Sequence, residues 1–250
     1  MRKMRKYIGL LLIFSILTMN VGAVFSGHVD NGPRIKNQYG DSVNWAGYAV
    51  TGPDGSVTNV KGSWTVPTVD CVSTPNSYSA SWTGIDGYNS GTVEQIGTSS
   101  NCRGTTPEYY AWYEFYPKFS FSVPIPVTAG DVISAEVNYK GKGQFVATIT
   151  NTRTGQTFSK TGKVAQAKRS SAEWIIEAPW SGGVLPLANF GVANFGPNYA
   201  TVNGISGNIG SFGTAVQSIT MVSYSNTPKA QPSALSGDGN FSVQWLSTGP

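Results

Sequence analysis

The pattern of apolar and polar positions along the chain is that of short β-strands separated by turns. From residue 44 onward, runs rich in aromatic and β-branched residues follow one another, and none shows the spacing of an amphipathic helix. Turn residues such as Gly-Pro-Asp-Gly at 52–55 separate the runs. The expected strands are 44–50, 56–66, 79–85, 92–97, 109–116, 132–139, 145–151, 172–177, 215–225 and 241–246. This spacing predicts an all-β fold, an antiparallel β-sandwich of two packed sheets, jelly-roll or concanavalin-like.

The segment 180–213 lacks such runs and is rich in Gly and Asn. We interpret it as long surface loops that border a cleft or merely pack. Its two Ala-Asn-Phe-Gly copies, at 188 and 193, are too few to indicate a repeat protein.

The run 171–177 places two carboxylates in an apolar, β-prone stretch. In a strand, alternate side chains share a face, so Trp174 and its alternate neighbours form an apolar face. Glu173, Ile175 and Glu177 share the opposite face. Those two carboxylates either point to solvent or lie in a cleft, where they can do acid–base chemistry.

The run 109–117 has a comparable density of functional side chains. Alternation places Tyr110, Trp112, Glu114 and Tyr116 on one face. Buried Tyr and Trp need hydrogen-bond partners, and a Glu among them needs a donor. The face is therefore unusual for pure packing.

The N-terminus carries a secretion signature. Residues 1–23 combine a basic start, an apolar run too short to span a membrane, and a small-residue cleavage site. We expect a signal peptide at 1–23, a flexible lead or short propeptide at 24–41, and a single β-sandwich domain at 42–250. The protein is therefore expected to be secreted, with no membrane association after signal removal.

Removal of the signal also removes four basic residues, which leaves 13 basic and 13 acidic residues. The mature chain is formally neutral and shows no basic patch. Nucleic acid is therefore not expected as a partner, and we expect a monomer.

Cys71 and Cys102 are the two cysteines of the chain. In an exported protein they are expected to form a disulfide, worth roughly 3 to 4 kcal/mol for a loop of about 30 residues. A catalytic thiol is the minor alternative, because it needs a base such as His.

The only histidine, His28, lies near the expected cleavage site, which argues against Ser-His-Asp and Cys-His mechanisms. Zinc motifs and nucleotide-binding motifs are also absent from the sequence, so no catalytic metal and no cofactor are expected. A structural Ca²⁺ site built from carboxylates and carbonyls stays open, although the sequence has no EF-hand loop. Carboxylate chemistry remains. The acids in aromatic, structured surroundings are Asp86, Glu114, Glu173 and Glu177, whereas Glu94, Glu108 and Glu136 are interpreted as ordinary loop or surface charges.

Several spaced motifs resemble one known family. They are Asn44-Trp45-Ala-Gly47, Trp82-x-Gly-Ile-Asp86-Gly, Gln95-x-Gly97, Ala111-Trp-Tyr-Glu-x-Tyr-Pro117 and Ala172-Glu-Trp-Ile-Ile-Glu177. Together and in this order they resemble the glutamic peptidases, or eqolisins, which are acid-acting, pepstatin-insensitive endopeptidases. The chain departs from the fungal members at Tyr110, where they carry an acidic residue, and in its near-neutral mature charge.

The resemblance implies polypeptide substrates and a catalytic pair formed here by Gln95 and Glu177. It also implies supporting or substrate-binding roles near the active site for Trp45, Trp82, Asp86, Glu114 and Tyr116. The chemistry is coherent. An ionised Glu177 can activate water, and the Gln95 amide can hold the oxyanion. Glu173, on the same face, is also counted as supporting and would raise one of the two glutamate pKa values if the pair is close.

Two alternatives remain open on the residues. A two-carboxylate glycoside hydrolase would use Glu114 and Glu177 and leave Gln95 without a role. A non-catalytic glycan-binding sandwich would use aromatic residues such as Trp82, Trp112 and Tyr116 only for binding.

Overall fold

The computed structural model describes residues 40–249. The expected signal peptide, the lead up to residue 39, and His28 lie outside these residues. The strands are β1 (Asp41–Ser42), β2 (Trp45–Thr51), β3 (Val57–Thr65), β4 (Ala80–Ile85), β5 (Val93–Arg103), β6 (Thr106–Tyr116), β7 (Phe121–Val123), β8 (Val132–Gly141), β9 (Gln144–Asn151), β10 (Thr157–Lys163), β11 (Ser171–Glu177), β12 (Val192–Phe195), β13 (Tyr199–Val202), β14 (Ile205–Asn208), β15 (Val216–Val222), β16 (Pro228–Pro232) and β17 (Phe241–Trp245).

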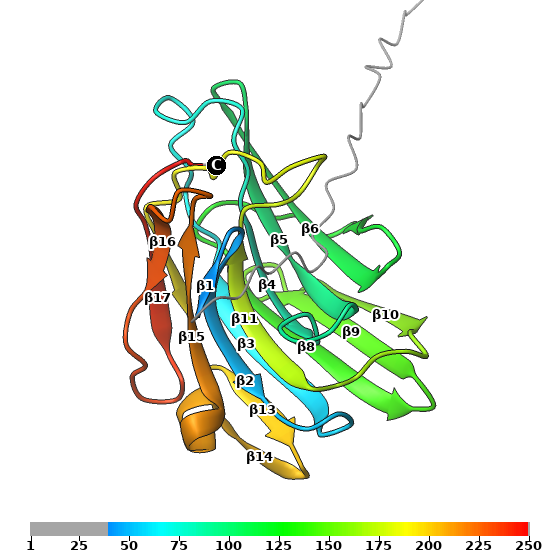
Figure 1. Ribbon diagram of the computed structural model, residues 1–250. Coiled ribbons are helices and arrows are strands. Elements are labelled where there is room, and N and C mark those ends of the chain that lie inside the picture. The colour runs from blue at the N-terminus through cyan, green and yellow to red at the C-terminus, as the bar shows by residue number, and fades with distance from the viewer. Residues whose placement is uncertain (1–39, 250) are drawn as a thin grey trace, which may run out of the picture.

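The strands form two sheets joined by one shared strand. The first sheet runs in the order β7-β6-β5-β4-β11-β2-β15, with all neighbours antiparallel. The second contains β10-β9-β8-β3, to which β13 and β12 add, and continues through β17 and β16. The first half of β15 pairs with β2, and its second half pairs with β16 and, in parallel, with β1. Figure 1 shows β15 in orange beside both β1 and β16.

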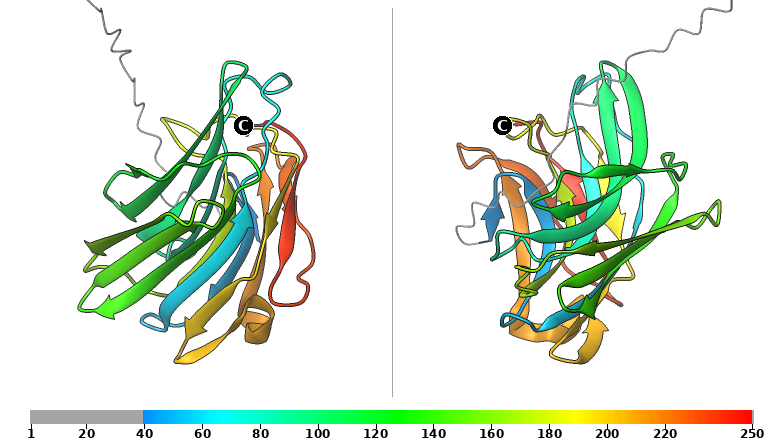
Figure 2. Two further views of the ribbon diagram at one scale, coloured as in Figure 1. Left: turned by 180° about the vertical axis from the view of Figure 1, so that it is seen from behind. Right: turned by 90° about the vertical axis from the view of Figure 1, so that its right-hand side faces the viewer.

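The core lies between the sheets. Figure 2 shows β8, β9 and β10 side by side from behind. Tryptophans from both sheets bridge the layers: the Trp64 indole of β3 donates to the Thr98 hydroxyl of β5 at 2.8 Å, and the Trp174 indole of β11 donates to the Lys61 carbonyl of β3 at 2.9 Å. Each bridge satisfies a buried N–H that packing alone would leave without a partner.

A second apolar cluster contains side chains of the first sheet alone. It is formed by Trp45, Ala49, Ala80, Trp82, Val93, Trp112, Ile175 and Ile219. These side chains point away from the second sheet, because their sequence neighbours Trp174 and Ile176 belong to the core between the sheets. We call this side of the first sheet the outer face.

The ten expected strands are all present, and the antiparallel sandwich is confirmed. The interpretation of 180–213 as loops was wrong, because this segment contributes β12, β13 and β14 and most of a 3-10 helix at Ile209–Ala215. These strands are only four residues long, so their alternation is too brief to stand out from the Gly and Asn around them. Between residues 40 and 249, no helix is long and apolar enough to cross a membrane.

Cys71 and Cys102 form a disulfide, as predicted. It ties the segment before β4 to the far part of β5, and both cysteines are buried. No free cysteine occurs among residues 40–249.

Candidate active site

Strand register places the two expected catalytic side chains on the outer face. Glu177 ends β11 and lies opposite Trp45 of β2 and Ala80 of β4. Gln95 lies near the start of β5, opposite Glu114 of β6. Residues more than 80 positions apart in the sequence therefore lie on one face of one sheet.

Both carboxylate oxygens of Glu177 accept hydrogen bonds. Asn44 Nδ2 donates to Oε1 at 3.1 Å, and Trp82 Nε1 donates to Oε2 at 2.8 Å. Burial raises the pKa of Glu177 well above its usual range, and the charge of Glu114 adds to the rise, whereas the side chains of Trp82, Trp45 and Asn44 oppose it, of which Trp82 and Asn44 donate hydrogen bonds to it. Glu177 is thus a buried carboxylate whose ionised form is held by neutral donors.

Glu114 orients the side chain of Gln95. Gln95 Nε2 donates to Glu114 Oε2 at 2.7 Å, and both side chains are buried. The bond fixes the plane of the amide, so Gln95 presents its remaining polar atoms in a defined direction. We expected Glu173 to raise one of the two glutamate pKa values if the pair is close, but the charge that raises the pKa of Glu177 is that of Glu114 on β6.

Two glycines of the motifs allow the strands and rings of the outer face to approach closely. A Cβ at Gly97 would lie 2.6 Å from Trp82 Cβ and 3.0 Å from Trp112 Cζ2. Gly47 has φ +144°, and a Cβ there would lie 2.1 Å from the Trp174 carbonyl oxygen. Only glycine fits these positions, which explains the Gln95-x-Gly97 and Trp45-Ala-Gly47 spacings.

The tryptophans expected at the site meet on the outer face. The rings of Trp45 and Trp82 pack edge to face with centroids 4.8 Å apart and an interplanar angle of 78°. Tyr110 and Tyr116 of β6 and Tyr88 of the loop before β5 pack against the same cluster. The aromatic surroundings lower the local polarity around Glu177.

Asp86 has a structural role. Its backbone is in the left-handed region at φ 70°, and its carboxylate accepts from the backbone N–H groups of Arg169 at 2.6 Å and Ser170 at 2.9 Å. These bonds anchor the residues just before β11 to the end of β4. Asp86 therefore supports the strand that carries Glu177, and no described hydrogen bond joins it to that glutamate.

Glu173 and Glu94 are buried carboxyl groups near Asp86. Burial raises the pKa of Glu173 and of Glu94 well above the usual range, and the charge of Asp86 adds to both shifts. The interpretation of Glu94 as an ordinary loop or surface charge was wrong: it is fully buried, next to Gln95 on β5 and therefore on the opposite face. The sequence alone does not show which face of a short strand a single acidic residue occupies. Glu108 is exposed and Glu136 only partly buried, as expected.

Asn44 is a site residue that the sequence analysis did not single out. It appeared there only as the start of a motif, yet it is fully buried and donates directly to Glu177. Its place immediately before Trp45, in a motif with two other site positions, was the available signal.

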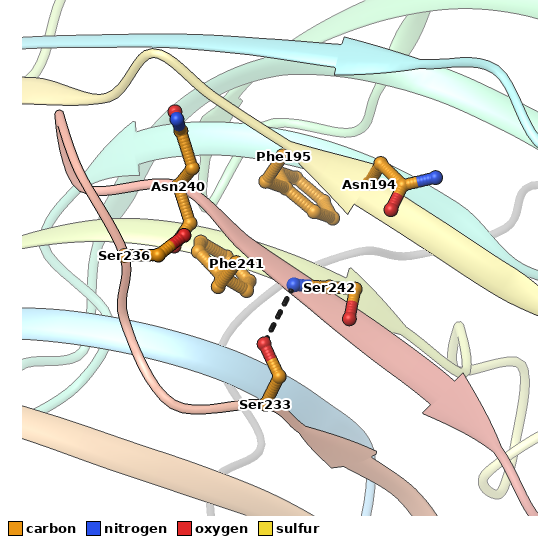
Figure 3. Close-up of a pocket in the computed structure, with 7 residues that line it drawn as sticks. All are labelled: Asn194, Phe195, Ser233, Ser236, Asn240, Phe241 and Ser242. Carbon is orange, nitrogen blue, oxygen red and sulfur yellow. Dashed lines mark hydrogen bonds between the residues drawn. The ribbon is translucent and has the colours of Figure 1, made fainter.

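No group of three or more His, Cys, Asp or Glu residues that could hold a metal ion occurs within the described part of the chain. A separate pocket of about 280 Å³ lies at β12, β17 and the loop before β17 (Figure 3). It is lined by Asn194, Phe195, Ser233, Ser236, Asn240, Phe241 and Ser242. This lining has no acid or base, so the outer face remains the candidate site for acid–base chemistry.

A buried, hydrogen-bonded glutamate on the same face as an oriented carboxamide is suited to general acid–base hydrolysis. The sequence model of the Peptidase A4 family matches residues 43–245. The chain belongs to this family, that of the glutamic peptidases or eqolisins, which are peptide-bond hydrolases. The family assignment favours a peptidase over the glycoside hydrolase and the glycan-binding module.

Two fungal proteins are among the similar sequences. Aspergillopepsin-2 from Aspergillus niger is 34% identical over 187 residues, which are 65% of this chain and 66% of that protein. Scytalidopepsin B from Scytalidium lignicola is 33% identical over 139 residues, 54% of this chain and 51% of that protein. The matches thus span about two thirds of the first relative and about half of the second.

Solved structures show the same fold. Scytalido-glutamic peptidase with a transition state analog inhibitor superposes with a TM-score of 0.70 at 26% identity, covering 82% of this chain and 98% of that one. Aspergilloglutamic peptidase from Aspergillus niger gives a TM-score of 0.60 at 24% identity, covering 68% and 99%. The second match supports the fold alone.

Proposed function

We propose that the protein is a secreted, acid-acting endopeptidase that hydrolyses polypeptides with Gln95 and Glu177 as its catalytic pair. Two contacts on the same face carry the proposal. The Glu177 carboxylate accepts hydrogen bonds from two donors, and Glu114 orients the Gln95 amide. Trp45, Trp82 and Tyr116 line the surroundings in which substrate binds, and Asp86 and Glu173 support β11.

In the proposed reaction, the fraction of enzyme in which Glu177 is ionised, a form that the Asn44 and Trp82 donors favour, takes a proton from water as the water oxygen forms a bond to the scissile carbonyl carbon. The carbonyl electron pair moves to its oxygen, and an N–H of the Gln95 side chain stabilises that oxyanion. Glu177 then returns the proton to the amide nitrogen, the oxyanion collapses, and the C–N bond breaks. The products are a carboxylic acid and an amine, and Glu177 is again ionised.

Acidic conditions also favour the stability of the folded protein. Glu94 and Glu173 are buried with pKa values well above the usual range, so the folded state favours their protonated forms. A rise in pH ionises them inside the protein. The proposed working range therefore has an upper bound that is set by the stability of the fold.

We also propose that residues 1–23 direct export, that 24–41 form a lead or short propeptide, and that 42–250 form one catalytic domain acting as a monomer. Polypeptides are the proposed partners, with no cofactor. N-terminal sequencing of the secreted protein tests the boundaries.

The proposal is tested with denatured casein at pH 3 to 4, with and without pepstatin. We expect cleavage that pepstatin does not block and that Glu177→Gln lowers by several orders of magnitude. Glu108→Gln, at an exposed position on β6, is the matched control and should keep full activity. Normal turnover by a folded Glu177→Gln variant would overturn the proposal.

A further inference from the structure

We infer that Asn44 is a positioning residue for the reaction: its side-chain amide holds the carboxylate of Glu177 and favours the ionised form that acts on water. The inference rests on the proposed function and extends it to a residue outside the catalytic pair.

The geometry of Asn44 is determined from both sides. Its Nδ2 donates to Glu177 Oε1 at 3.1 Å, and its Oδ1 accepts from the Ser42 hydroxyl at 3.3 Å. Its backbone carbonyl accepts from the Ala178 N–H at 2.8 Å. The amide is therefore held by the residue two before it, while its backbone is paired with the residue that follows Glu177.

Ser42 is itself fixed in place. Its hydroxyl also accepts from the backbone N–H groups of Asn44 at 3.3 Å and Trp45 at 3.1 Å, and all three residues are buried. Ser42 belongs to β1, which pairs in parallel with β15 at Thr220 and Met221. A paired sheet edge thus supports the donor, as a preorganised site requires.

Few charged groups compete with this donor. The strands on either side of β11 are β2 and β4, and neither carries an ionisable acid or base apart from Tyr48, which points into the core. Among the described residues, Glu114 of β6 is the charged group that raises the pKa of Glu177, and Glu173 lies on the same face of β11. A neutral donor at Asn44 is one of the few contacts that oppose burial and the charge of Glu114.

The two carboxylate oxygens of Glu177 accept hydrogen bonds from different residues, so the effect of each donor can be tested separately. Trp82 holds Oε2 and is part of the aromatic cluster, so its loss would also disturb packing. Asn44 holds Oε1 and belongs to neither apolar cluster. Changing Asn44 therefore alters the carboxylate with a smaller effect on the substrate-binding surroundings.

The test measures kcat/KM against pH for the mature protein and its Asn44→Ala and Asn44→Asp variants, together with Tm. A lost hydrogen bond to a charged group predicts a fall of about 10- to 100-fold in kcat/KM with KM nearly unchanged. It also predicts that the acid limb of the profile moves to higher pH by about one to two units. Asn44→Asp keeps the size of the side chain but places a second carboxyl against Glu177, so its acid limb should move further.

Asn198→Ala is the matched control. Asn198 is equally buried and donates to the Gly239 carbonyl at 2.9 Å, away from Glu177. We expect it to lower Tm and leave the acid limb unmoved.

Folded Asn44 variants whose acid limb stays within about 0.2 pH units of the parent would overturn the inference. Loss of folding in both variants would make Asn44 a structural residue and would equally overturn it. Glu177→Gln in the same assay distinguishes failure of the inference about Asn44 from failure of the proposed function. If Glu177→Gln retains turnover, the catalytic pair is wrong, whereas if it alone is inactive and the Asn44 variants titrate normally, only the inference about Asn44 fails.

Discussion

Gln95 and Glu114 are joined across the β5–β6 pair by a 2.7 Å hydrogen bond from amide to carboxylate. Glu114 therefore has two effects on the candidate site. It orients the amide, and its charge raises the pKa of Glu177 on another strand. Glu114 is not a member of the expected catalytic pair, yet it acts on both Gln95 and Glu177.

Glu114→Gln separates these two effects. A glutamine oxygen can still accept from Gln95, but the negative charge is lost, so the pKa of Glu177 should fall. We expect the acid limb of kcat/KM to move to lower pH, with a loss of kcat of less than about tenfold if the amide stays oriented. Measurement of kcat/KM from pH 2 to 6 tests this, with Glu108→Gln as the control at an exposed site. An acid limb that moves upward would contradict the assigned coupling.

Gln95→Ala removes the proposed oxyanion donor and leaves the base. Loss of such a donor typically costs about 10² to 10³ in kcat. If Gln95 and Glu177 serve one transition state, the double variant should lose little more than Glu177→Gln alone. Multiplicative losses in single-turnover assays would mean that they act independently. Near-normal turnover of Gln95→Ala, together with inactivity of Glu114→Gln, would favour a two-carboxylate mechanism instead.

Stability should decline as the pH rises from acid toward neutral. The pKa values of Glu94 and Glu173 are raised in the folded state, so their contribution is fully present below the unfolded value of about 4.3 and is lost as pH rises through the folded pKa. We expect Glu94→Gln to gain on the order of 1 kcal/mol at pH 7 relative to the parent, about 2 to 4 °C in Tm. Calorimetry at pH 4 and pH 7 measures the effect. If the parent and the Glu94→Gln variant lose the same Tm between pH 4 and pH 7, Glu94 does not contribute to the decline.

Asp131 should act in the opposite direction. Arg153 forms an ion pair with it and, with Asn151 and Thr128, lowers its pKa to about 2. This contribution is present above the unfolded value of about 3.9 and is lost as pH falls toward 2. Asp131→Asn should therefore destabilise the protein at pH 5 but cost much less at pH 2. Equal losses of Tm at both values would assign the effect to hydrogen bonding rather than charge.

The disulfide should be a stabilising and not a catalytic feature. Replacing Cys71 and Cys102 by serine is expected to lower the free energy of unfolding by roughly 3 to 4 kcal/mol, because the unfolded chain regains a loop of about 30 residues. Denaturant titration measures the loss. Activity at low temperature should persist, and its disappearance in a folded double variant would contradict a purely structural role.

Strand alternation was enough to predict which face of the sheet several candidate residues occupy. It placed Glu177 and Ile175 on one side of β11 and Trp174 on the other, and it grouped Trp112 with Glu114. Strand order was not available from the pattern, because β11 inserts between β2 and β4, more than 80 residues earlier in the chain. For the same reason, the contact of Asn44 with Glu177 and the effect of Glu114 on that glutamate do not follow from the sequence alone.

The parallel pairing of β1 with β15 also affects how the site is assembled. Asp41 and Ser42 pair with Thr220 and Met221, which come much later in the sequence. During synthesis, the edge that supports Asn44 has no partner until β15 has been made. The candidate site is thus complete only once β15 has been made, and a nascent chain that stops before β15 lacks the paired edge behind Asn44.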